Sequence, residues 1–459
     1  MTNRDPAADA PRAHDESGIR GGRVRSLARS SWKVSSRFGW GLADQGLSSI
    51  TNFALGVVVA RTVSARDFGA FGIAFGVYTA GLGLMRAMSS EPLMVRFSAV
   101  MDERWRVGAR AATGTALAVG FVAGLACFTV GSLIANPVLA AVLRSLGITF
   151  PGLLVQDTWR FAFFAAGRGS AAFVNDLVWA AALFASMAYL LSAGQDSVGW
   201  LVLAWGGSGS VAGMFGALQS RVGPVPTQTV AWVREQRDLI PRYVGEFGVT
   251  TLAAQVSIVT IGAVGGLAAV GAIRAGQLLF GPLNVIYMGA GLAGLPEAVR
   301  LLRSSTGGLR RACVSLSIML ASSALAVGVL ASLLPERVGV ALLGESWPAA
   351  RTVILPISIW MAGFGVALGA GIGLRALAAA QLSLRARLLV APIGVAMSVV
   401  GAATAGARGG AWGFATAAGI GAVVWWRFLR RGLREHDRRA DLHVGSADGT
   451  DVPPIPFGV

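Results

Sequence analysis

Three arginines lie inside otherwise apolar stretches of the sequence, at Arg86, Arg160 and Arg274. A guanidinium group stays protonated at any physiological pH, and its planar fork of N–H donors matches the oxygens of a phosphate or carboxylate. An arginine in an apolar segment either extends to the nearest polar boundary or supplies positive charge to a hydrated internal cavity. In the second case, the chemistry of these residues is the binding of an anionic group.

Carboxylates occur in the same kind of apolar stretch. Asp44 and Glu246 matter most, because each lies near the start of an apolar segment and the two are 202 positions apart. Asp176 lies within a further segment. One interpretation is an ion pair with a neighbouring arginine that only fixes helix packing. The other is charge balance or proton coupling, because a low-dielectric environment disfavours the ionised form of a carboxylate.

The sequence lacks the residue patterns of other chemistries. All three histidines lie in the polar tails, at His14, His436 and His443, and the two cysteines stand far apart, at Cys127 and Cys313. No Cys/His spacing suits a metal ion, and no glycine-rich run is followed by the Lys-Ser/Thr of a phosphate-binding loop. We therefore predict no metal site, no cofactor and no enzymatic activity.

The apolar stretches that must position these residues dominate the composition. Of 459 residues, 54% are apolar and 14% charged, against about 45–50% and about 25% in soluble domains. A membrane-spanning helix needs about 20 apolar residues, and we predict an all-α integral membrane protein with twelve transmembrane helices. The predicted spans are 38–60, 68–90, 111–135, 146–166, 173–193, 198–219, 244–264, 270–294, 312–334, 350–373, 384–405 and 409–428.

The basic residues alternate between the two sides of this predicted topology. The formal charge is +16, and Lys33 is the only lysine. One set of tails and loops holds 31 basic residues and the other set holds six. Positive residues are retained on the cytoplasmic side of a membrane, so both termini are predicted to be cytoplasmic in a multi-pass membrane protein. A nucleic-acid partner is not expected, because no folded basic domain is large enough to present a binding surface.

The two halves of the sequence match at an offset of about 202 to 205 residues. The aligned pairs are Asp44 with Glu246, Gly69 with Gly271, and Pro151 with Pro356. Duplicated bundles are common in transporters, and we predict two six-helix lobes. The predicted division is a disordered basic cytoplasmic arm over 1–37, an N-terminal lobe over 38–220, a cytoplasmic connector over 221–242, a C-terminal lobe over 243–428 and a basic cytoplasmic tail over 429–459.

Two adjacent segments carry a family resemblance. Residues 38–47 read FGWGLADQGL, and residues 60–72 read ARTVSARDFGAFG. An Ala-Arg dipeptide at the end of the first helix, a short polar turn, and an acidic-aromatic-Gly-x-aromatic stretch resemble the first two helices of bacterial polysaccharide-type flippases. These flippases belong to the multidrug/oligosaccharidyl-lipid/polysaccharide exporter (MOP) superfamily. The sharp resemblance covers about 35 residues, while topology and repeat extend it loosely over the chain.

The resemblance implies a transporter that moves an undecaprenyl-pyrophosphate-linked saccharide across the cytoplasmic membrane by alternating access, in polysaccharide biosynthesis and export. The implied partners are that lipid-linked saccharide, membrane lipids, and polysaccharide polymerase or export proteins. In this setting we assign Arg86, Arg274 and Arg160 to substrate binding, and Asp44, Glu246 and Asp176 to coupling or charge balance.

Two other function classes remain open. A drug or cation antiporter of the same superfamily would favour acidic or aromatic cavity walls over arginines. A membrane-embedded polysaccharide polymerase or ligase would carry a large outer loop, and the longest one here, 334–349, is short.

Overall fold

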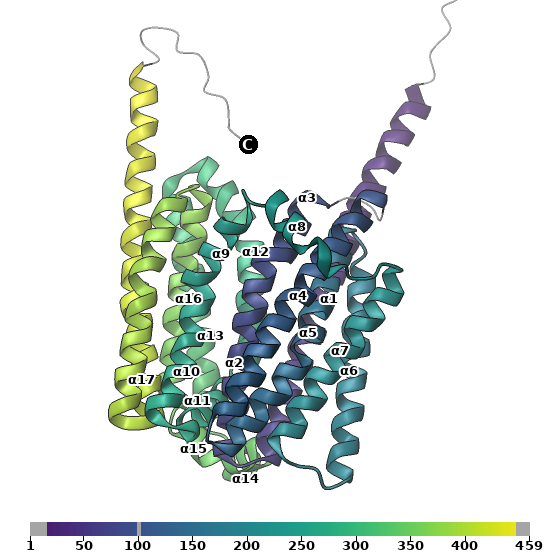
Figure 1. The fold of residues 1–459 in the computed structure, drawn as a ribbon. Coiled ribbons are helices and arrows are strands. Elements are labelled where there is room, and N and C mark those ends of the chain that lie inside the picture. Colours follow the sequence, from purple (N-terminus) through teal and green to yellow (C-terminus); the bar gives the residue numbers. More distant parts are fainter. Residues whose placement is uncertain (1–15, 99–101, 447–459) are drawn as a thin grey trace, which may run out of the picture.

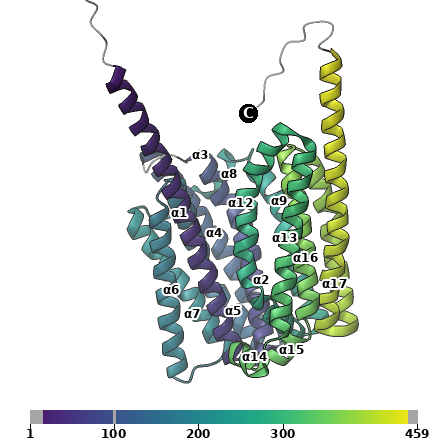
Figure 2. The same cartoon turned by 180° about the vertical axis from the view of Figure 1, so that it is seen from behind.

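The computed structural model describes residues 16–98 and 102–446, and within these ranges its regular secondary structure is entirely helical. The helices form a bundle of roughly parallel rods, and helices α1 and α17 extend beyond the same end of it (Figures 1 and 2). Nine helices of the described chain are long and apolar enough to cross a membrane, and two apolar helices are shorter. The expectation of an all-α, multi-pass membrane protein is therefore confirmed.

The first half of the chain supplies most of the long apolar helices. Their starts follow local capping rules. Ser64 accepts a hydrogen bond from the backbone N–H of Asp67, Asp102 caps α4 in the same way, and Asn136 with Pro137 opens α5. The elements are α1 (Glu16–Thr62), α2 (Ala65–Met85), the π-helical turn η1 (Arg86–Ser90), α3 (Glu91–Arg96), α4 (Glu103–Leu133), α5 (Pro137–Ala165), α6 (Gly169–Ser192) and α7 (Val198–Ser220).

Helix α1 begins earlier than the sequence predicts. Residues 16–37, expected to belong to a disordered arm, are part of this helix, while residues 1–15 lie outside the described residues. Five of the residues 16–37 are arginine, a good helix former, but three are glycine and six are serine, which are poorer ones. The helix instead extends one that already exists, which avoids the cost of nucleating a new one. The apolar first span therefore continues as a polar helix on its N-terminal side.

The connector and second half contain shorter elements. They are η2 (Pro226–Gln228), α8 (Thr229–Glu235), α9 (Ile240–Phe247), the π-helical turn η3 (Gly248–Leu252), α10 (Ala253–Gly265), α11 (Leu267–Leu279), α12 (Gly281–Ser304), α13 (Thr306–Ser332), α14 (Glu336–Leu343), η4 (Gly344–Ser346), α15 (Trp347–Arg351), α16 (Ile354–Ala376) and α17 (Ala380–Ser446). The predicted span 270–294 is interrupted between α11 and α12, where Pro282 occupies the first turn of α12. Proline lacks a backbone N–H and is therefore readily accommodated in the first turn of a helix.

Helix α17 is two successive helices joined at a sharp reversal. Ala405 and Gly406 have non-helical backbone angles, and Gly406 has φ 56° and ψ −136°. This position lies in the gap predicted between the spans 384–405 and 409–428. The second part, yellow in Figure 1, runs back along the bundle and past its end.

The connector is fixed to the first half by polar contacts. Arg96 forms a two-pronged ion pair with Asp238, at 2.6 and 2.7 Å from its Nη2 atom. A backbone hydrogen bond together with Arg96 holds the pKa of Asp238 below its ordinary value. The indole N–H of Trp232 donates to the carbonyl of Met88 at 2.9 Å. These contacts position α8 against η1.

Helices α2 and α11, from opposite halves, meet through a reciprocal glycine contact. A methyl group added at Gly69 would lie 1.8 Å from the carbonyl oxygen of Leu267, and one added at Gly271 would lie 2.0 Å from that of Ala65. Small residues allow helix backbones to approach this closely in membranes. Leu267 and Ala65 each lie four residues before a glycine of the pair, so the contact has the same form from both sides.

Candidate functional site

Helix α5 carries the polar residues of the interior of the first half. It packs against α2, α4, α6 and α7, and its residues Gln156 and Asp157 are buried. With 3.6 residues per turn, Gln156 and Arg160 lie about 40° apart around α5, whereas Asp157 points about 100° from Gln156 and about 60° from Arg160. One helix therefore presents polar groups to two sets of neighbours.

On one side, α5 meets the π-helical turn η1, which continues α2, through a bidentate ion pair. The Nε and Nη2 atoms of Arg86 donate to the two oxygens of Asp157 at 2.8 and 2.6 Å. The Asp157 side chain is 4% exposed and that of Arg86 is 33% exposed. The guanidinium also lies 5.1 Å from the ring centroid of Phe161. Arg86 is thus held by a buried carboxylate while part of its surface stays accessible.

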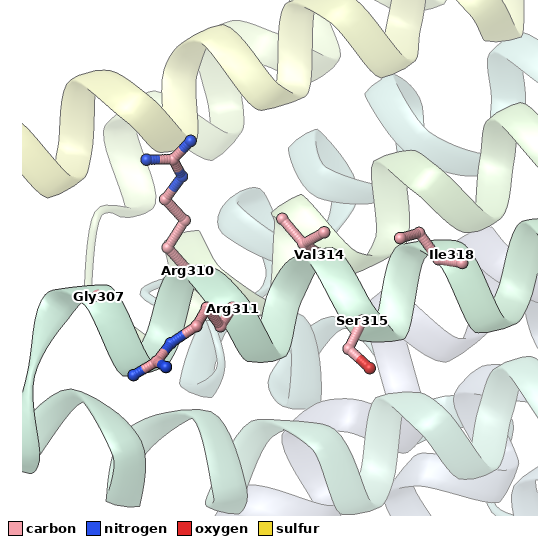
Figure 3. Close-up of a pocket in the computed structure, with 6 residues that line it drawn as sticks. All are labelled: Gly307, Arg310, Arg311, Val314, Ser315 and Ile318. Carbon is pink, nitrogen blue, oxygen red and sulfur yellow. The ribbon is translucent and has the colours of Figure 1, made fainter.

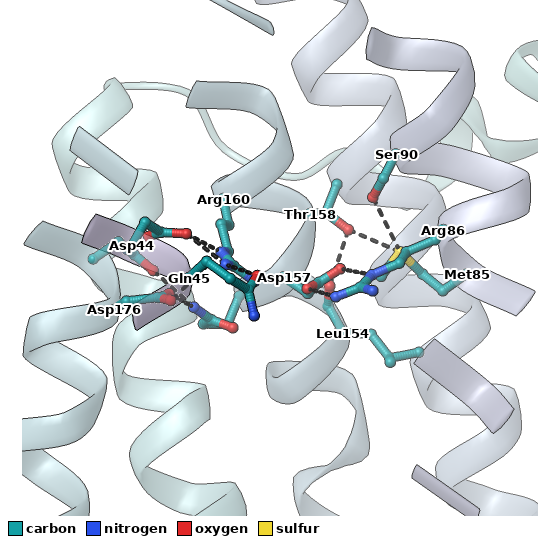
Figure 4. Close-up of polar contacts among 12 residues, drawn as sticks. Asp44, Gln45, Met85, Arg86, Ser90, Leu154, Asp157, Thr158, Arg160 and Asp176 are labelled. Atoms are coloured by element: carbon teal, nitrogen blue, oxygen red, sulfur yellow. Dashed lines mark hydrogen bonds and ion pairs between the residues drawn. The ribbon is translucent and has the colours of Figure 1, made fainter. Parts of the chain in front are cut away.

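On the other side, Arg160 joins α5 to α1 and α6. Its Nε donates to Asp44 at 2.6 Å and lies 3.5 Å from Asp176, and its Nη2 donates to Gln45 at 3.4 Å. The side chains of Asp44 and Asp176 are almost completely buried, and that of Arg160 is 13% exposed. Figure 4 shows both carboxylates gathered around this guanidinium.

Neutral amides complete the second group. Gln156 donates to Asp176 at 2.8 Å and to the side-chain oxygen of Asn175 at 3.2 Å. Asn175 in turn donates to the carbonyl of Ala212 in α7 at 2.9 Å. Buried polar groups require such partners, so α5, α6 and α7 are tied together by one continuous network.

We refer to Asp44, Arg86, Asp157, Arg160 and Asp176 together as the N-terminal charge cluster (Figure 4). It holds three carboxylates and two guanidinium groups, so with all groups ionised one negative charge is in excess. In addition, the Oδ1 atom of Asp44 is buried without a hydrogen-bond partner. An uncompensated buried charge is unfavourable, and one bound proton or monovalent cation would balance the cluster.

Arg274 has a different environment. It lies on α11, facing α2, with its guanidinium carbon 4.2 Å from the ring centroid of Phe75. Its Nη1 donates to Gln277 at 3.4 Å, and within the described residues no carboxylate forms an ion pair with it. Arg274 is therefore a half-buried cation between the two halves, held by an aromatic face and an amide.

Glu246 is not placed like Asp44. Its side chain on α9 is 62% exposed, and Oε1 lies 3.2 Å from Nη1 of Arg387 on α17. The buried carboxylates of the described chain, Asp44, Asp157 and Asp176, all belong to the first half. The sequence repeat aligns Asp44 with Glu246, but the two acids have different surroundings.

Asp157, Gln156 and Asn175 were not among the site residues predicted from the sequence. A usable signal existed, because Gln156, Asp157 and Arg160 form a dense polar group within one apolar span. Such groups in membrane helices normally face the bundle interior. The partners on α1, η1 and α6 follow only from the packing of the helices.

Comparison with known proteins identifies the fold. No protein-family model and no curated protein matches the sequence. Solved structures match over most of the chain. An inward-facing multidrug resistance MATE family transporter of the MOP superfamily is 14% identical, with a TM-score of 0.63, covering 85% of this chain and 95% of its own. The lipid II flippase MurJ in an inward closed conformation is 12% identical, with a TM-score of 0.63, covering 90% and 94%.

An outward-facing MATE transporter is also similar, at 13% identity and a TM-score of 0.50, covering 86% of this chain and 94% of its own. The expected resemblance to MOP superfamily transporters is therefore confirmed at the level of the fold. The chain has the fold of MOP superfamily transporters, and the structures it resembles are transporters and flippases. The charge cluster and Arg274 are the candidate functional residues within that fold.

Proposed function

We propose that this protein is a flippase that moves a lipid-linked saccharide with an anionic pyrophosphate linkage, of the undecaprenyl type, across the inner membrane. The observation that carries the proposal is Arg274, a half-buried cation between the two halves with no carboxylate partner among the described residues. A guanidinium in this position attracts phosphate oxygens and repels organic cations. The fold shared with the lipid II flippase supports the same substrate class.

The other two arginines have secondary or indirect roles in the proposal. Arg86 keeps one third of its side chain accessible while Asp157 neutralises much of its charge, so we assign it to secondary contacts with the substrate. Arg160 is almost enclosed by Asp44 and Asp176. Its role in the proposal is to hold the N-terminal charge cluster together, whereas direct substrate binding was the expectation from sequence.

We assign coupling to the acids of the N-terminal charge cluster. Asp44 has a buried carboxylate oxygen without a partner, and the cluster has one carboxylate more than it has guanidinium groups. Asp44 and Asp176 join α1 and α6 to α5 through their ion pairs with Arg160. Uptake or release of a proton by either acid would change the strength of these ion pairs. Exposed Glu246 is left with the local role of joining α9 to α17.

The proposal includes twelve membrane passes in two lobes, with both termini cytoplasmic. In the second half, α9 with η3 and α10 would form one pass, α11 with α12 another, and the two parts of α17 one each. The reciprocal contact of Gly69 and Gly271 supports a two-fold relation between the lobes. The two glycines are 202 residues apart, and so are Ala65 and Leu267, whose carbonyls they face. Alternating access would then close and open this contact.

A drug or cation antiporter is the second candidate, because a MATE family transporter matches the fold as well as the lipid II flippase does. Three buried carboxylates also favour cation coupling. Arg274 argues against an organic cation as the substrate, since it would place like charges together between the two halves. Both candidates can be tested in one assay.

The experiment uses the purified protein reconstituted into liposomes with a fluorescent undecaprenyl-pyrophosphate oligosaccharide, whose transbilayer movement is read by an impermeant quencher. A parallel assay follows a cationic dye. We expect movement of the saccharide, and we expect Arg274→Gln to reduce its rate about ten- to hundred-fold, because a hydrogen bond to a charged group is worth about 1.5–3 kcal/mol. Arg351→Gln, an exposed arginine paired with Glu336, is the matched control.

Transport of the dye without movement of the saccharide would reject the flippase assignment in favour of the antiporter. Saccharide movement at the wild-type rate in Arg274→Gln would show that Arg274 does not contact the substrate. Folding of each variant is checked by its unfolding temperature in detergent.

A further inference from the structure

A groove separate from the charge cluster runs along the outer face of the second half. Its walls are α13 and the second part of α17, and its floor is α16 at Val366. The lower part of this groove has a volume of about 390 Å³ and is lined mainly by apolar side chains. We call it the α13–α17 groove.

The polar groups at the floor of the groove already have hydrogen-bond partners. The indole N–H of Trp426 and the hydroxyl of Ser317 both donate to the carbonyl of Val366, at 3.2 and 3.1 Å. Along the α13 wall, Val314, Ile318 and Leu325 occupy one helix face, and these residues are 37%, 60% and 45% exposed. The lower groove is therefore suited to hydrocarbon.

The upper end of the groove is strongly basic. Arg310 from α13 and Arg430 and Arg434 from α17 line it, together with Asp437. Figure 3 shows the Arg310 side chain directed toward the yellow helix, which is α17. In the described part of the chain, none of these three arginines forms an ion pair with a carboxylate; the nearby pair joins Arg431 to Glu435 at 2.7 Å.

The adjoining surface of α17 continues the basic region. Arg427, Arg430, Arg431, Arg434 and Arg438 surround a further hollow of about 480 Å³, with Glu435 as its acidic residue. Five arginines against one glutamate give a net positive charge at the end of the bundle from which α1 and α17 extend (Figure 1).

From these observations we propose that the α13–α17 groove binds an anionic phospholipid of the surrounding membrane. Its phosphate lies among Arg310, Arg430 and Arg434, and an acyl chain follows the apolar α13 wall. Arginine matches phosphate oxygens bidentately, and basic residues at a membrane surface attract anionic headgroups. The succession of an arginine cluster and an exposed apolar channel matches the order of headgroup and chain in a phospholipid.

The consequence for the molecule is a lipid that bridges α13 and α17. It would neutralise arginines that the described chain leaves unpaired and would fill the channel between two helices of the second half. Bound in this way, the lipid stabilises the fold without occupying the region between the two halves, so the site is distinct from the one proposed for transport.

Native mass spectrometry of the purified full-length protein with phosphatidylglycerol or phosphatidylcholine of identical acyl chains tests the site. We expect the wild type to retain phosphatidylglycerol preferentially, and the triple variant Arg310→Gln, Arg430→Gln, Arg434→Gln to lose that preference by about tenfold or more. The control variant Arg104→Gln, Arg110→Gln, Arg303→Gln removes the same charge from exposed arginines that line no part of the groove and should keep it. Ser322→Trp, which fills the apolar channel, should also weaken retention.

Equal retention in the wild type and the groove triple variant would overturn the proposal, as would an equal loss in the control variant. Competition by tail-less glycerophosphoglycerol or inorganic phosphate as strong as that by the lipid would show that the arginines bind a free phosphate, and would reject the lipid assignment. Competition by intact phosphatidylglycerol alone supports it.

Discussion

Arg160 and the acids around it show how buried charges are organised at the level of single residues. The guanidinium contacts two nearly inaccessible carboxylates on two other helices, so its removal leaves uncompensated charge in the interior. The sequence identified Arg160, Asp44 and Asp176 as candidates because charged residues in apolar spans face the interior. Which arginine meets which acid was unpredictable, because the partners lie 16 to 116 positions from Arg160 and are joined only by packing.

Replacing Arg160 should therefore destabilise the fold. We expect Arg160→Gln to lower the free energy of unfolding by about 3–5 kcal/mol, the cost of breaking a buried pair by removing one partner. Adding Asp44→Asn should recover part of the loss, because it removes one unpaired charge. The measurement is thermal unfolding in detergent, with Arg300→Gln, an exposed i,i+3 pair with Glu297, as a control with an effect below about 1 kcal/mol.

Asp44 also gives a prediction for pH dependence. If its unpartnered oxygen takes up a proton during transport, Asp44→Asn should flatten the pH profile of flipping in proteoliposomes, since the amide cannot titrate. Glu246→Gln serves as the control, because Glu246 is largely exposed and its profile should match the wild type. An unchanged profile in Asp44→Asn, combined with a lower unfolding temperature, would restrict Asp44 to a packing role.

At the level of elements, hydropathy predicts most helices because an apolar run of membrane length has few alternatives. The apolar run predicted to end at residue 193 corresponds to helix α6, which ends at Ser192. The reversal within α17 falls where the gap between the spans 384–405 and 409–428 is predicted. Two features escaped this reasoning. The break between α11 and α12 lies inside a continuous apolar run, so hydropathy does not reveal it. The polar segment 16–37 is helical although it has no apolar periodicity.

The contact between α2 and α11 gives an element-scale prediction. A methyl group at Gly72 would lie 3.0 Å from Cγ1 of Val270, so a cysteine pair, Gly72→Cys with Val270→Cys, should oxidise to a disulfide in a background lacking Cys127 and Cys313. Because the proposed alternating access would separate these helices, we expect the oxidised protein to lose flipping and to regain it with reductant. Each single cysteine is a control. Undiminished flipping by fully cross-linked protein would mean that the helices stay together throughout the cycle.

At the scale of the whole molecule, the sequence repeat and the reciprocal glycine contact have one origin if the chain is two related lobes. The offset of 202 that aligns Gly69 with Gly271 also aligns Ala65 with Leu267. Gly69 faces the carbonyl of Leu267, and Gly271 faces the carbonyl of Ala65. The charge chemistry does not follow the repeat, since the buried acids of the described chain belong to the first half. In the proposed function, a shared backbone with different side chains would allow one lobe to hold the coupling groups while the other holds Arg274.

The distribution of the arginines predicts the orientation of the molecule in the membrane. The connector and the end of α17 carry Arg237 and Arg434, which lie at the end of the bundle rich in basic residues. The α10–α11 and α17 turns carry exposed Ala268 and Arg408. Because positive loops are retained in the cytoplasm, cysteines at 268 and 408 should react with an impermeant maleimide added to intact cells, and cysteines at 237 and 434 should react only after permeabilisation. Cys127 and Cys313 are buried, so their own labelling should be low. Labelling of 237 or 434 from outside would invert the topology and place the basic groove of α13 and α17 at the opposite face.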